Sequence, residues 1–166
     1  MTQATLIPTT LTQTMERLYR ELIRAASSLD SPFLLLVRLY WGWQFFEAGW
    51  SKTSHLGRVA NFFATIGIPA PALSAAFISG LEIAGGILLA TGLGSRLIAL
   101  LLTIDMVVAL STAHREALLS IFSNPAKFFP ATPVTFLIAS LIVLIFGPGK
   151  FSLDAILASR MKKIAR

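Results

Sequence analysis

Four long apolar segments constrain this chain more than any other feature of its sequence. They lie at about residues 33–50, 71–91, 97–113 and 131–147. A hydrocarbon core about 30 Å thick is crossed by a helix of roughly 17–25 mostly apolar residues, so the segments suit a bilayer. Hydrophobic residues make up 55% of the chain and charged residues only 13%, which is too apolar for a small soluble domain. The sequence predicts an all-α integral membrane protein, with residues 32–151 forming one four-transmembrane-helix bundle.

The two ends of the chain are predicted to form amphipathic helices on the membrane surface. Residues 1–31 carry apolar side chains at three- and four-residue spacing, as an interfacial helix does. Charged residues interrupt this segment, so no cleaved signal peptide is expected. A break is expected at Ser28–Pro32, where proline would open the first span. Gly147–Gly149 are expected to end the fourth span, and residues 152–166 to form a basic amphipathic C-terminal helix.

Lysine and arginine residues predict the orientation of the four spans. An even number of crossings puts both termini on one side, together with the loop between the second and third spans. That side carries Arg17, Arg20, Arg24, Arg96, Lys150, Arg160, Lys162, Lys163 and Arg166, against Lys52, Arg58, Arg115 and Lys127 on the other. Both termini are therefore expected to be cytoplasmic. The net charge of +6 is explained by topology and anionic lipids, and no nucleic-acid partner is expected.

Three charged residues fall inside the apolar segments at similar depth. With about 1.5 Å of rise per residue, Arg38, Glu82 and Asp105 lie roughly 8, 13 and 12 Å from the inner ends of their spans. A lone charge at such depth is costly, so we predict that Arg38 contacts Glu82 or Asp105 inside the bundle. Two interpretations stay open. The cluster either fixes helix register, or it exchanges protons and binds a small polar head group in an apolar pocket.

A second polar group is predicted nearer the outer face, around Glu47. This carboxylate lies among the aromatic residues of the first span, and Lys52 and His114 are its candidate partners at similar depth. His55 and His114 are weak candidates for imidazole ligands of a cofactor. The chain has no cysteine, which excludes thiol redox couples and thiolate metal sites, and no metal is expected. No nucleotide-binding loop or catalytic triad is visible, and catalytic residues stay unknown.

Several short motifs resemble those of the DoxX family of small four-helix bacterial membrane proteins. They are Arg38 with Gly42, Gly49 and Lys52; Glu82-Ile-Ala-Gly-Gly with Gly92 and Arg96; and the closing Gly147-Pro-Gly-Lys-Phe-Ser-Leu-Asp154. The resemblance covers about residues 33–157. It implies a four-helix bundle in the bacterial inner (plasma) membrane and an association with membrane redox chemistry, because relatives are linked to quinol oxidase and thiosulfate:quinone oxidoreductase assemblies.

Two functions of different class follow. In the first, the protein is an accessory or anchoring subunit of a quinone- or quinol-linked redox complex, with other membrane subunits as partners and no cofactor of its own. In the alternative, it binds quinone or another small lipophilic molecule, or acts as an oxidoreductase on it, beside Arg38, Glu82 and Asp105. A lipid-accessible cavity at the charged residues would favour the alternative, and a filled, fully paired core the first.

Overall fold

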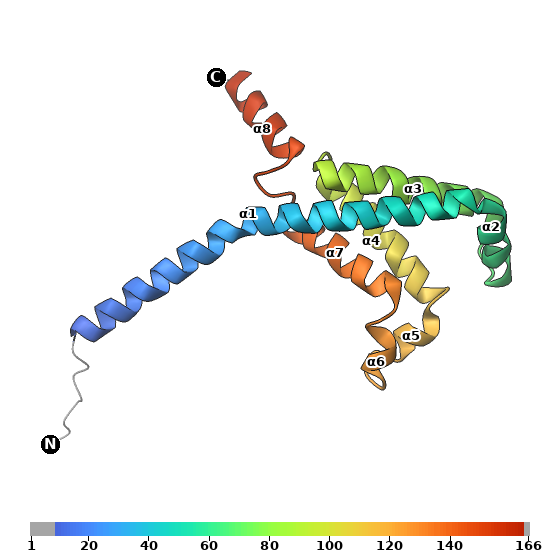
Figure 1. Cartoon of the computed structure of the whole chain (residues 1–166), viewed down its shortest axis with the longest axis horizontal. Helices are drawn as coiled ribbons and strands as arrows, with labels where there is room; N and C mark the ends of the chain where they lie inside the picture. Colours follow the sequence, from blue (N-terminus) through green and yellow to red (C-terminus); the bar gives the residue numbers. More distant parts are fainter. Residues whose placement is uncertain (1–8, 165–166) are drawn as a thin grey trace.

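The computed structural model describes residues 9–164 of the chain, and within them every regular element is a helix (Figure 1). The predicted all-α class is confirmed. The helices are α1 (Thr9–Ser54), α2 (Leu56–Thr65), α3 (Pro71–Thr91), α4 (Ser95–Ser111), α5 (Arg115–Leu119), α6 (Pro125–Phe128), α7 (Thr132–Phe146) and α8 (Leu153–Ile164).

The four longest segments of regular structure, α1, α3, α4 and α7, pack around a shared core. Helix α1 packs mainly on α3, and α4 mainly on α7, with α3–α4 and α1–α7 contacts joining the two pairs. The core holds buried side chains from all four helices: Phe45, Leu89, Ile98, Ala99, Leu102, Met106, Phe136 and Val143. A tight turn with Gly92 and Gly94 at positive φ joins α3 to α4, which makes these helices antiparallel neighbours.

Glycines set the close approach of α1 to α3. A Cβ added at Gly42 would lie 2.7 Å from the carbonyl oxygen of Gly86, and one at Gly49 would lie 2.7 Å from that of Ser79. Small residues let two helix backbones meet in this way. The pairs run in opposite directions along the two helices, so the N-terminal part of the α1 seam faces the end of α3 and its C-terminal part faces the middle of α3. This register decides which polar residues meet.

The predicted break at Ser28–Pro32 is wrong, because α1 continues through Pro32 as one helix of 46 residues. A proline inside a helix removes one backbone donor and bends the helix, but the helix can continue on both sides of the bend. The ribbon of α1 changes direction along its length, and its N-terminal part projects away from the other helices (Figure 1). Residues 13–30 are all exposed. The first eight residues of the predicted N-terminal helix lie outside the described part of the chain.

Length and composition single out one described helix as able to cross a membrane, α3, while α7 is apolar but shorter. The apolar part of α1 contains Arg38 and Glu47, and α4 has 17 residues and contains Asp105. Helices α3, α4 and α7 thus lie close to the predicted bounds of the last three apolar segments, and the first segment lies inside α1.

Candidate ligand pocket

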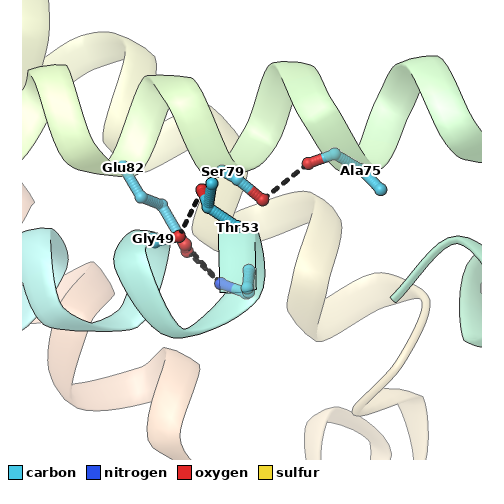
Figure 2. Close-up of polar contacts among 6 residues, drawn as sticks. Gly49, Thr53, Ala75, Ser79 and Glu82 are labelled. Atoms are coloured by element: carbon cyan, nitrogen blue, oxygen red, sulfur yellow. Dashed lines mark hydrogen bonds and ion pairs between the residues drawn. The ribbon is translucent and has the colours of Figure 1, made fainter. Parts of the chain in front are cut away.

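Glu82 on α3 forms an ion pair with Lys52 near the C-terminal end of α1. The ammonium of Lys52 donates to both carboxylate oxygens of Glu82. The Glu82 side chain is only 2% exposed, whereas that of Lys52 is 33% exposed. Figure 2 shows the Glu82 carboxylate directed from α3 toward the last turns of α1, close to Gly49 and Thr53. Gly49 allows this contact, because a Cβ there would lie 2.9 Å from the Cβ of Glu82.

The predicted contact of Arg38 with Glu82 or Asp105 is wrong. The guanidinium of Arg38 donates instead to three backbone carbonyls, those of Pro148, of Phe151 at 2.7 Å and of Ala90 at 3.5 Å. The α1–α3 register explains the difference, because it places Arg38 beside the α3–α4 turn. A Cβ at Gly92 would come within 2.8 Å of its Nη1 atom. The long side chain then extends toward the helix ends rather than toward Glu82.

The segment that follows α7 closes this end of the helices. Asp154 accepts hydrogen bonds from the backbone N–H groups of Gly94 (2.8 Å) and Ser95 (2.9 Å) at the start of α4. Its own N–H donates to the carbonyl of Gly92. Ser152 is buried, and its hydroxyl accepts from the N–H of Ala155 at the start of α8. The GPGKFSLD motif is therefore a structural clamp that ties α1, the α3–α4 turn and α8 together.

Asp154→Ala is expected to lower the free energy of unfolding by about 1–2 kcal/mol, the cost of losing a helix cap. Burial acts to raise the pKa of Asp154, but the hydrogen bonds from Ser95 and Gly94 outweigh it and hold the pKa below its usual range. The stabilisation is thus complete above the unfolded pKa of about 3.9 and is lost as the pH falls through the folded value.

The free energy of unfolding of the wild type and of Asp154→Ala, measured between pH 3 and 7, checks this expectation. The difference in stability should be constant near neutral pH and shrink at the acid end. A difference that grows as the pH falls would contradict the capping role of the carboxylate.

A cavity of about 540 Å³ lies beside the Lys52–Glu82 pair. It is partly open and is bordered by the C-terminal turns of α1, by α2, by α3 and α4, and by the N-terminal part of α7. Its walls are mainly apolar and aromatic, and they include Phe62, Phe63, Ile78, Met106, Ala109 and Phe136. Asp105 also lines the cavity. It is 8% exposed, and its Oδ2 atom has no hydrogen-bond partner among residues 9–164. Glu82 and Asp105 therefore share one site, as predicted from their depth, but with Lys52 rather than Arg38 as the cation.

The remaining site candidates do not form a second buried cluster. Glu47 is exposed on α1, and no ion pair joins it to Lys52 or His114 among the described residues. His55 lies between α1 and α2, and its Nδ1 atom is 3.0 Å from the carbonyl oxygen of Ser51 in the last turn of α1. His114 is half-buried at the cavity wall. Residues 9–164 contain no group of three histidine, cysteine or acidic side chains placed to hold a metal ion.

Sequence reasoning missed the partner of Glu82 and the role of α2. Lys52 was one of two candidate partners of Glu47, which lies five residues earlier on the same helix. The spacing of Gly42 and Gly49, seven residues apart, matches the spacing of Gly86 and Ser79 on α3. Read as antiparallel contacts, these pairs put Gly49 beside Ser79. Lys52 and Glu82 each lie three residues beyond that contact, one on each helix, where their long side chains can reach each other. The short helix between residues 54 and 66 was expected, but its contribution to a cavity wall depends on tertiary packing.

Comparisons with known proteins show two relatives and a family. A Bacillus subtilis (strain 168) protein named "Putative oxidoreductase CatD" is 32% identical over 83 residues, which cover 50% of this chain and 60% of that protein. A Haemophilus influenzae protein that carries only the name "Uncharacterized protein" is 31% identical over 133 residues, or 75% of this chain and 82% of that protein. No solved structure shows a significant match. The DoxX family model matches residues 33–115, which contain Lys52, Glu82 and Asp105, and the chain belongs to the DoxX family.

Proposed function

We propose that this DoxX-family protein is a multi-pass protein of a bacterial inner membrane, with α1, α3, α4 and α7 as its spans and both termini in the cytoplasm. The support is the surface of these helices. Large apolar side chains are exposed on all four, including Leu36, Trp43, Leu73, Phe77, Ile87, Leu97, Ile104, Ile138 and Ile145. In water such a surface would be a large exposed apolar area, whereas in a bilayer it faces lipid.

Within that membrane, the proposed role is to bind a small lipophilic molecule with a polar head, of the quinone and quinol class, in the cavity beside Lys52, Glu82 and Asp105. The observation that carries the proposal is the cavity itself. Its volume lies within the roughly 300–1,000 Å³ of small-molecule sites, and a few polar groups converge on it from apolar walls. A filled and fully paired core would have favoured a purely anchoring subunit.

The polar groups suit a head group that carries oxygen. An ammonium has three N–H donors, and Lys52 uses two of them on the oxygens of Glu82. The third is available to an acceptor on a bound ring. The aromatic rings of Phe62, Phe63 and Phe136 provide a wall against which a flat ring can stack. A membrane protein with such a site serves redox chemistry as the quinone-binding partner of other subunits, which agrees with the oxidoreductase named for the Bacillus subtilis relative.

Ala109→Phe tests this proposal, because a phenyl ring at this lining position fills part of the cavity. We expect the purified protein in detergent to bind decylubiquinone, and Ala109→Phe to weaken binding by at least about 10-fold, which is 1.4 kcal/mol. The measurement is equilibrium dialysis of the quinone against each protein, with melting temperatures recorded alongside.

Val107→Phe is the matched control, since Val107 lies two residues away on α4, is exposed and does not line the cavity. It should bind the quinone as the wild type does. Equal affinities of Ala109→Phe and Val107→Phe, with both variants folded, would refute binding in this cavity.

A further inference from the structure

Among the described residues that line the cavity, Asp105 is the one with a buried oxygen that has no hydrogen-bond partner. Glu82 also lines the cavity, but both of its carboxylate oxygens accept hydrogen bonds from Lys52. Asp105 on α4 is buried, and its Oδ2 atom has no hydrogen-bond partner within residues 9–164. None of the ion pairs of the described residues includes Asp105. A buried carboxyl group without a partner costs free energy, and a bound molecule that donates a hydrogen bond relieves that cost.

The chemistry of a carboxylate determines which ligand can pair with the buried Asp105 and remove this free-energy cost. In its ionised form, Asp105 accepts hydrogen bonds and donates none. A quinone ring presents carbonyl oxygens, which are also acceptors only, so a quinone at Asp105 leaves both groups unpaired. A hydroquinone or phenol presents an O–H donor. Sites built to hydrogen-bond a hydroxyl strongly reject analogues without one, because the buried partner is then left alone.

We infer that Asp105 makes the cavity selective for ring ligands that bear a free hydroxyl, so that it holds the reduced, hydroquinone form in preference to the quinone. This inference rests on the proposed function and names the ligand form that the site prefers. Lys52 and Asp105 then act as complementary groups. The remaining N–H of Lys52 donates to an oxygen of the ring, and the free oxygen of Asp105 accepts from a hydroxyl.

A phenol and its methyl ether, which lacks the O–H donor, test the inference without redox side reactions. The probes are 4-nonylphenol and 4-nonylanisole, in which a methyl group replaces the hydroxyl hydrogen. We expect the wild-type protein in lipid nanodiscs to bind the phenol at least about 10-fold more tightly than the anisole, measured by equilibrium dialysis. When oxygen is excluded, decylhydroquinone should likewise bind more tightly than decylquinone.

Asp105→Asn is the decisive variant, because it keeps the shape of the side chain but replaces one acceptor oxygen by an N–H donor. In this variant the affinities for the phenol and the anisole should differ by no more than about 3-fold, since the amide can donate to the ether oxygen. Glu116→Gln, at an exposed carboxylate outside the cavity, should keep the wild-type preference.

The possible results separate this inference from the proposed function. Equal binding of phenol and anisole by the wild type, with both displaced in Ala109→Phe, would overturn the selectivity and leave the binding site standing. An unchanged preference in folded Asp105→Asn would overturn the role of Asp105. Absence of binding by all four ring compounds would overturn both proposals.

Discussion

Gly42→Leu is expected to separate α1 from α3 and to lower the free energy of unfolding by about 3 kcal/mol or more, at the upper end of the cost of overpacking. A Cβ at this position would lie 2.7 Å from the carbonyl oxygen of Gly86 and 2.9 Å from the backbone nitrogen of Ala90. Both obstacles are backbone atoms, so no rotamer change can make room. The helices would have to move apart, and the Lys52–Glu82 contact farther along the same seam would be strained as well.

Gly80→Leu is the matched control on the partner helix, because a Cβ at Gly80 meets nothing within 4 Å. Leucine has a higher helix propensity than glycine, so this variant should be as stable as the wild type or more stable by roughly 0.5–1 kcal/mol. Unfolding of the three proteins in mixed micelles with increasing denaturing detergent measures the difference. If Gly42→Leu unfolds at the same detergent fraction as Gly80→Leu, the glycine seam does not hold α1 against α3.

The helix boundaries were largely predictable because local signals mark them. The segment predicted at 71–91 is helix α3, with Pro71 at its first turn and Gly92 in the left-handed conformation just after its end. The fourth segment ends at Phe146, directly before Gly147 at positive φ, and α8 starts one residue after Ser152. Proline and glycine act on the backbone of their own neighbourhood, so sequence alone reveals them.

The continuity of α1 and the partner of Arg38 were not predictable in the same way. Pro32 is compatible with both the start of a helix and a bend inside one, and the residues around it do not decide between them. The depth argument for Arg38 counted residues from the span ends and ignored the direction of a long side chain. Arg38 turns toward the carbonyls of Pro148 and Phe151, which come from a segment 110 residues later.

The candidate site was predicted in part. Glu82 and Asp105 were expected to share a layer because they lie at similar depth, and both line the cavity. The cation that pairs with Glu82 depends on the register of α1 against α3, which glycine contacts between distant segments set. The cavity depends further on how α2 and the start of α7 cover the charged residues. Such contacts join residues far apart in sequence, and no local pattern encodes them.

Lys52→Met is expected to cost about 2–4 kcal/mol of stability at neutral pH, because it leaves the buried carboxylate of Glu82 without its cation. The lower end allows for Lys52, whose side chain is 33% exposed and retains some hydration. Methionine keeps the length and the apolar stem, so the lost charge causes the effect. The same detergent titration measures it.

The double variant Lys52→Met/Glu82→Gln should recover most of the loss, because the neutral amide no longer needs a cation, and the coupling between the two positions should exceed about 1 kcal/mol. Lys127→Met is the control, because the side chains of Lys127 and its partner Glu116 are 51% and 88% exposed. This substitution should change the free energy of unfolding by less than about 1 kcal/mol. Arg38→Met combined with Glu82→Gln should show additive losses, as Arg38 bonds only to backbone carbonyls among the described residues. Coupling of Glu82 to Arg38 instead of Lys52 would show that the α1–α3 register is wrong.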